Sequence, residues 1–194
     1  MIDGRIELHS HTTHSDGELL PSELARRAVA LGHAAIAMTD HADATNLADL
    51  IERLQRLITQ QGGDWPLYVL VGVELTHVAP QSIARLARQA KRLGAEWVVV
   101  HGETIVEPVA PGTNRAAIEC PDVDLLAHPG FLTLEEARLA AAKAAVNSVQ
   151  ADVDALTLKA TIPGTVVDVN LTQGQQVAAG ELVMAVADYS KWIV

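Results

Sequence analysis

The sequence predicts an α/β fold over its first 139 residues, followed by a shorter segment of antiparallel β character. Three observations indicate this: five short apolar runs recur along the chain, a stretch with helical periodicity follows each run, and glycines or prolines separate many of these segments. Near-continuous apolar strands are typical of parallel sheets buried on both faces. We therefore expect a parallel α/β sheet or barrel in this part of the chain.

The expected elements alternate regularly. The first helix opens at Pro21, repeats apolar side chains at Leu24, Ala28 and Leu31, and stops at Gly32. Further helices are expected at 44–61, 82–93, 114–118 and from Thr133, where Thr133 and Glu136 have the spacing of a capping box. The strands are expected at 5–8, 35–38, 68–73, 97–100 and 123–127.

The pattern changes near residue 140. Residues 140–155 form an alanine-rich helical stretch, and short β segments follow it, with turn dipeptides at 163–164, 173–174 and 179–180. Two parts are therefore expected, residues 1–140 and residues 141–194, with the helix between them shared.

Charge and composition narrow the function classes. The 194 residues contain 14 Lys and Arg against 24 Asp and Glu, a net charge of −10, which disfavours a protein that coats nucleic acid or an anionic membrane. No apolar run is long enough to span a membrane, and the N-terminus lacks a secretory pattern, so we expect a cytoplasmic protein without membrane insertion. The single cysteine, Cys120, excludes an internal disulfide and a CxxC zinc or redox pair.

Residues that bind metals follow all five predicted strands. The carboxyl ends of parallel strands meet at one rim, so these side chains are expected to lie close together. Imidazole and carboxylate are ligands that divalent transition metals prefer. A single histidine is more often a cap or a core residue, but that explanation does not account for five successive strand ends. The residues are His9, His11 and Asp16 after the first strand, His41 after the second, and Glu74, His101 and His128 at the next three.

This arrangement favours hydrolysis of phosphate esters. Metal ions a few ångströms apart lower the pKa of a bound water and hold phosphoryl oxygens, so the expected nucleophile is a hydroxide on the metal rather than a side chain. Arg115 follows the fourth strand and is a candidate for gripping the substrate phosphate, since guanidinium binds phosphate in a bidentate manner. An ordinary surface salt bridge is the alternative for Arg115.

The segments HSHTTHSDG, MTDH, GVELTH, VVVHGE and LLAHPG resemble the polymerase and histidinol phosphatase (PHP) family, most closely its small phosphoesterase-like members, over about residues 4–140. The resemblance implies a distorted seven-stranded (β/α) barrel. It also implies two or three ions of zinc, manganese or iron and hydrolysis of a small phosphorylated substrate, as in histidinol phosphatases. By motif, the ligands would be His9, His11, Asp16, His41, Glu74, His101 and His128, with Glu74 as the bridge between two ions.

The chain departs from the family pattern after His128. The family ends with two more strands and an Asp-x-His pair, and this sequence has no later histidine. We expect an incomplete barrel, fewer ions and impaired activity. We also expect an open sheet edge, unless the tail or a second copy in a homo-oligomer covers it.

Residues 160–194 resemble the biotinyl/lipoyl-like β-hairpin segment of membrane-fusion (periplasmic adaptor) proteins. The chain thus resembles a hybrid of two families. A second interpretation is a non-catalytic scaffold with a remnant metal site, in which the tail mediates assembly. A third is a nuclease or polymerase-associated domain with the same site, which the net charge of −10 disfavours.

Overall fold

The computed structural model describes residues 4–155, 163–172, 174–175, 181–188 and 190. The chain divides into two compact units, Met1–Lys143 and Ala144–Val194. Each unit has a sheet of its own.

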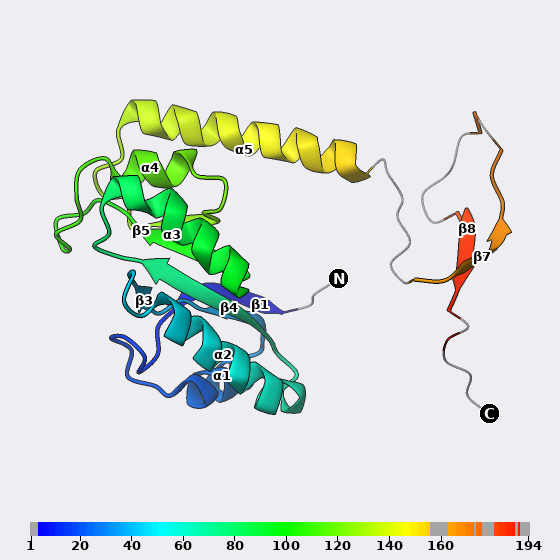
Figure 1. Ribbon diagram of the computed structural model, residues 1–194, viewed down its shortest axis with the longest axis horizontal. Helices are drawn as coiled ribbons and strands as arrows, with labels where there is room; N and C mark the ends of the chain where they lie inside the picture. Colours follow the sequence, from blue (N-terminus) through cyan, green and yellow to red (C-terminus); the bar gives the residue numbers. More distant parts are fainter. Residues whose placement is uncertain (1–3, 156–162, 173, 176–180, 189, 191–194) are drawn as a thin grey trace. The chain divides into compact units, whose positions relative to one another are not determined.

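The first unit is built on a parallel sheet that curls into about half of a barrel (Figure 1). The strands run in the order β1-β2-β4-β5-β6, and a short strand, β3, pairs with the second half of β4. Every pairing in this sheet is parallel, so all the carboxyl ends lie at one edge. The strands are β1 (Arg5–Ser10), β2 (His33–Met38), β3 (His41–Ala42), β4 (Tyr68–Leu75), β5 (Trp97–His101) and β6 (Leu125–Ala127). The predicted α/β fold with a parallel sheet is confirmed.

Five helices connect and extend these strands: α1 (Pro21–Ala30), α2 (Leu47–Gln61), α3 (Pro80–Leu93), α4 (Thr113–Glu119) and α5 (Leu134–Ala155), with a 3-10 turn, η1 (Gly62–Asp64), after α2. Both α1 and α3 begin with proline, whose fixed φ suits the first helical position. The predicted capping box is confirmed at α5, since Thr133 N and Oγ1 both donate to Glu136 Oε2 and Glu136 N donates to Thr133 Oγ1.

The core of this unit lies between the sheet and the helices that cover it. Val73 and Val98 in the central strands and Ile83 on α3 are fully buried. Burial of each large aliphatic side chain stabilises the folded state by roughly 1.5–3 kcal/mol. This burial keeps the strands in register and fixes where each one ends. The positions of the residues after the strands are therefore set by the core.

The predicted start of the second helix is wrong by three residues. Residue 44 was expected to be helical, but Asp43 accepts hydrogen bonds from Thr45 N and Thr45 Oγ1, and Asn46 Nδ2 donates to His41 O. Such local side-chain bonds compete with helix formation. The helix therefore begins at Leu47, and the two residues after Asp40 pair with β4 as the unpredicted strand β3.

The second unit contains one antiparallel pair, β7 (Thr165–Val169) with β8 (Met184–Ala187). The predicted turn at 163–164 lies just before β7, whereas Gln173 and residues 179–180 of the other two predicted turns fall outside the described residues. A paired β segment fits the expected antiparallel character, and the biotinyl/lipoyl-like identity stays a prediction. Helix α5 crosses residue 140, where the sequence predicted the boundary. Within the described ranges, no helix combines the length and apolar character needed to cross a bilayer.

Candidate metal centre

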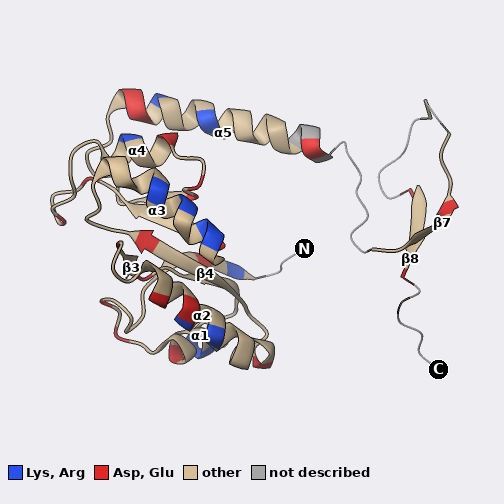
Figure 2. Cartoon of the chain, in the orientation of Figure 1, with Lys and Arg blue, Asp and Glu red and all other residues tan. Residues whose placement is uncertain are grey.

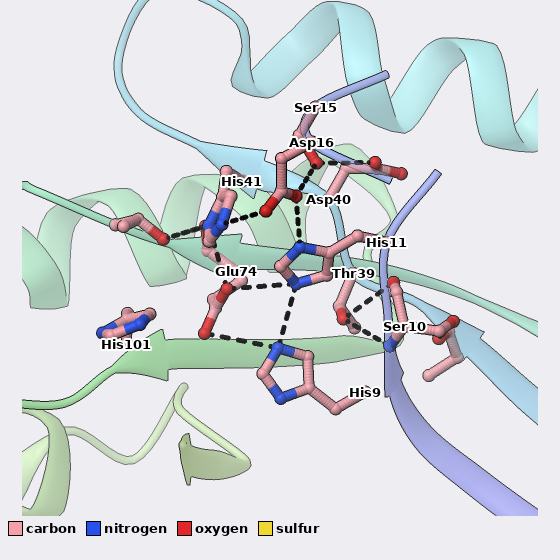
Figure 3. Close-up of polar contacts among 12 residues, drawn as sticks. His9, Ser10, His11, Ser15, Asp16, Thr39, Asp40, His41, Glu74 and His101 are labelled. Carbon is pink, nitrogen blue, oxygen red and sulfur yellow. Dashed lines mark hydrogen bonds and ion pairs between the residues drawn. The ribbon is translucent and has the colours of Figure 1, made fainter. Parts of the chain in front are cut away.

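The structure brings the seven predicted ligand residues together at the carboxyl ends of the strands, and Figure 3 shows all of them except His128. His11 and Asp16 come from the loop after β1, and His128 follows β6; the other four residues lie on strands, namely His9 on β1, His41 on β3, Glu74 on β4 and His101 on β5. Neighbouring imidazole rings in the cluster have centroids 4.3 to 6.2 Å apart.

Glu74 lies at the centre of the cluster and is fully buried. Its Oε1 is 3.3 Å from His9 Nε2, while its Oε2 is 3.2 Å from His11 Nε2 and 2.9 Å from His41 Nδ1. Neither oxygen has a hydrogen bond of good geometry. A buried carboxylate is costly unless cations or donors compensate it. The orphaned oxygens therefore fit a centre that holds cations.

Two groups within the cluster have the geometry for an ion each. In the first group, His9, Glu74 and His128 offer ligand atoms that all lie within 4.8 Å of one another, and in the second group His11, Asp16 and His41 do the same. Glu74 Oε1 faces His9 of the first group, and Oε2 faces His11 and His41 of the second. Nitrogen and oxygen donors of this kind suit zinc, manganese or iron.

Contacts behind the cluster orient two of the imidazoles. His41 Nδ1 lies 2.6 Å from Thr76 Oγ1, and His101 Nδ1 lies 3.0 Å from Gly102 O. A hydrogen bond at one ring nitrogen fixes the ring and leaves the other nitrogen for a ligand bond. The contact with Gly102 therefore fixes the ring of His101. His41 Nδ1 also lies 2.9 Å from Glu74 Oε2 and its Nε2 lies 3.6 Å from Asp16 Oδ2, so this ring is held between the two carboxylates.

Two pockets open at the cluster. One, of about 390 Å³, lies over the ligand residues and is also lined by Thr104, Val106 and Glu107. The other, of about 370 Å³, shares Asp16, His41 and Glu107 with it. No lysine or arginine is among the described residues that line either pocket.

Arg115 is not brought into this cluster. Its guanidinium lies on α4 and makes 2.9 Å ion pairs with Glu119 and Glu135, and about half of the side chain is exposed. The position therefore matches the surface salt bridge rather than the expected contact with a substrate phosphate.

The family follows from the sequence comparison. The sequence model of the PHP domain matches residues 7–151, which is most of the chain. The chain belongs to the PHP domain family. This family forms a phosphoesterase-type superfamily whose members commonly bind divalent metals, and the clusters described above offer ligands of that kind.

Two relatives show how much of a PHP protein the chain spans. It is 54% identical over 134 residues, 69% of its length, to an uncharacterised protein of Methanocaldococcus jannaschii, and the match covers 62% of that protein. It is 28% identical over 130 residues, 66% of its length, to ribonuclease P protein component 3 of Methanosarcina barkeri, and the match covers 48% of that protein. The chain thus spans between about half and two thirds of each relative.

Two histidines of the PHP chain adopt backbone conformations that are uncommon for residues other than glycine. His128, with φ 51°, is a member of the first group, and His77, with φ 56°, lines the 370 Å³ pocket and lies 3.0 Å from Glu107. They are the only such residues in the part of the chain that the structure describes. Backbone strain of this kind concentrates at functional sites.

Protonation of the metal-free PHP centre is governed by Glu74. The ion pair with Glu74 raises the pKa of His11 to about 9, against the opposing effect of burial, and the contact with Asp16 adds to the shift. Glu74 also raises the pKa of His41. Burial alone would raise the pKa of Glu74, but His11, His41 and His9 outweigh it and hold that pKa far below its usual range. Glu74, His11 and His41 therefore form a charged network, and a bound ion must displace the protons of its imidazoles.

Metal affinity is expected to rise with pH up to about 9. An ion needs the unprotonated imidazole of His11, whose pKa is about 9, so each pH unit below that value should weaken binding about tenfold for the proton displaced. The metal-free fold should show the opposite trend, since a raised pKa contributes stability that is complete below 6.5 and is lost as pH rises through about 9. Titration with Mn²⁺ at pH 7, 8 and 9 measures the slope, and a flat profile would contradict this prediction.

Sequence reasoning missed three side chains that support the ligands. Thr12 and Asp40 are fully buried beside the loop after β1, and Thr76 contacts His41. The sequence does mark Asp40, because this carboxylate directly follows an apolar strand and directly precedes the candidate ligand His41. It does not mark Thr12 or Thr76, because their roles depend on contacts between distant segments.

Proposed function

We propose that this PHP domain is a metal-dependent hydrolase of small phosphate esters. The observation that carries the proposal is Glu74, a fully buried carboxylate whose two oxygens face two separate groups of ligand residues beneath an open pocket. A carboxylate placed in this way can bridge two ions, and paired ions stabilise both the attacking and the leaving oxygen in phosphoryl displacement.

The residues have distinct roles in this proposal. His9 and His128 would hold one ion with Glu74, while His11, Asp16 and His41 would hold the other, and bound ions would supply Lewis acidity and an activated water. His101 is buried and lines the pocket between the two groups, where it is a further ligand or a contact for the substrate. These 194 residues contain no histidine after His128, so an Asp-x-His pair supplies no ligand here and we expect this chain to have weak activity.

The pocket walls favour a small substrate. Because no lysine or arginine lines the described walls, the chain offers only histidine as a cation for additional phosphates. The carboxylates of Asp43 and Glu107 in the second pocket would instead favour a leaving group with a positive charge. A histidinol-phosphatase-like specificity, the finer part of this proposal, agrees with that preference.

The test is hydrolysis of p-nitrophenyl phosphate and histidinol phosphate with added Zn²⁺, Mn²⁺ or Fe²⁺. We expect measurable turnover that a His9→Ala variant lowers at least about 100-fold, the upper end of the cost of losing a metal site's supporting contact. His33→Ala is the matched control, because His33 lies at the start of β2 and its Nδ1 contacts Ala28 O instead of the cluster. Protein that binds two ions but hydrolyses neither ester would overturn the proposal.

A second candidate is a non-catalytic role in an RNA-containing assembly. It is favoured by the 28% identity to ribonuclease P protein component 3 and by basic residues along α3, which are coloured blue in Figure 2. Arg85, Arg88 and Arg92 are exposed and recur at helical spacing. RNA binding that falls in an Arg85→Glu and Arg92→Glu double variant, without any ester hydrolysis, would favour this candidate.

A further inference from the structure

We propose that Asp40 is a positioning residue that assembles the second group of ligands, His11, Asp16 and His41, and leaves the first group unaffected. The inference rests on the proposed metal centre. It gives a role to a buried carboxylate that is outside both ligand groups.

Asp40 is fully buried and both of its oxygens accept hydrogen bonds from one loop. Thr12 N donates to Oδ1 at 2.8 Å, and Thr12 Oγ1 donates to Oδ2 at 2.9 Å. Ser15 Oγ also donates to Oδ1, at 2.8 Å (Figure 3). Hydrogen bonds to an ionised carboxylate are about twice as strong as neutral ones. The loop after β1 is therefore tied to the residue that directly precedes His41.

The loop itself is wound around Thr12. Ser15 N and Gly17 N both donate to Thr12 O, and His14 N donates to Thr12 Oγ1. A Cβ at Gly17 would lie 2.4 Å from His11 O, so the chain returns very close to where the loop began. Once Asp40 fixes Thr12, little freedom remains for the loop.

This closed loop carries the ligands. It places Asp16 Oδ1 2.6 Å from His11 Nδ1 and Asp16 Oδ2 3.6 Å from His41 Nε2. Asp16 is exposed, and its described side-chain contacts are with Ser15 of the same loop and with His11 and His41, so its position depends on the loop. Asp40 thus acts on all three ligands of the second group: on His11 and Asp16 through the loop, and on His41 through the adjoining peptide.

The first group has different support. His9 lies within β1 and Glu74 within β4, where the ladder of the sheet fixes them, and His128 follows β6. The Asp40 side chain makes no described hydrogen bond to any of these residues. Its backbone oxygen accepts from Glu74 N at 3.0 Å, a contact that a change of the side chain leaves in place. Loss of the Asp40 side chain should therefore weaken one ion site and spare the other.

The experiment is a count of bound Mn²⁺ by equilibrium dialysis of the full chain with Asp40→Ala, Asp40→Asn and Ser15→Ala. We expect two ions in the unmodified protein. In Asp40→Ala, one ion should bind at least about tenfold more weakly, the range expected for loss of a supporting contact, while the other keeps its affinity. Asp40→Asn should recover part of the loss, since an amide oxygen still accepts from Thr12 N and Ser15 Oγ.

The controls separate positioning from general damage. Asp64→Asn alters an exposed carboxylate of η1 that belongs to neither ligand group and lines neither pocket, and it should keep both ions. Ser15→Ala removes one of the three hydrogen bonds to the Asp40 carboxylate. If Asp40→Ala does not fold, the selective weakening of one ion in Ser15→Ala tests the same inference. Equal weakening of both ions, or retention of both, would overturn this inference alone. Fewer than two ions in the unmodified protein would overturn the proposed two-ion centre as well.

Discussion

A Glu74→Gln variant is expected to lose metal from both groups and, with it, the proposed phosphoesterase activity. The substitution keeps the shape of the side chain but replaces a ligand oxygen with an amide nitrogen and removes the buried negative charge. Because Oε1 faces His9 and Oε2 faces His11 and His41, one change affects both ion sites. We expect metal affinity to fall at least about 100-fold. Loss of a residue that merely supports a ligand costs up to about this much, and Glu74 is itself a proposed ligand.

The metal-free variant offers a second measurement. The pKa of His11 is about 9 chiefly because of Glu74, so in Glu74→Gln it should fall toward its ordinary value of 6.5. A histidine titration followed by NMR checks this directly. Glu107→Gln is the control, since Glu107 lines the same pocket but pairs with His77. If His11 kept a pKa near 9 in Glu74→Gln, Glu74 would not be the partner that governs the centre.

The strand-end residues could be predicted because the geometry of a parallel sheet leaves little choice. Apolar runs locate the strands, and parallel strands bring their carboxyl ends to one edge, so His9, Glu74 and His101 had to lie near one another. The register of β4 with β5 then places Glu74 opposite Val99, two residues before His101. Core burial and topology together therefore determine this part of the cluster without any knowledge of the loops.

The loops could not be predicted in the same way. Asp16 and His11 reach the cluster because a turn wound around Thr12 is tied to Asp40, a contact that spans 28 residues of sequence. The direction of Arg115 depends likewise on where α5 begins, since Glu135 of that helix holds the guanidinium. Periodicity describes segments one at a time, so it does not give contacts between side chains of different segments.

The division of the ligand residues into two groups could not be predicted from the sequence either. Motifs indicate seven ligand-type residues. The structure adds that His9, Glu74 and His128 lie in one group and His11, Asp16 and His41 in another. The spacing HxH predicts two imidazoles on the same side of the strand, which suits one ion or two adjacent ions. In the structure His9 Nε2 and His11 Nε2 lie 3.0 Å apart, with His9 in the first group and His11 in the second, which agrees with adjacent ions.

Removal of metal by a chelator is expected to lower the melting temperature of the protein by roughly 10 °C. An ion that binds only the folded state adds about 2.7 kcal/mol for each site when its free concentration is one hundred times Kd. For a domain of this size each kcal/mol is worth roughly 2–4 °C, and binding of ions to histidines in the unfolded chain reduces the gain. Two occupied sites therefore give a shift of this order.

Thermal melts at pH 8 with and without chelator, and after Mn²⁺ is restored, measure this shift. The shift should halve in His128→Ala, which removes a ligand of the first group alone, and should remain in His33→Ala, which lies outside the cluster. A melting temperature that is indifferent to metal would mean that the histidines and Glu74 satisfy one another without an ion. The contacts of 2.9 to 3.3 Å from Glu74 to His9, His11 and His41 would then be the compensation for its burial, and the proposed two-ion centre would be wrong.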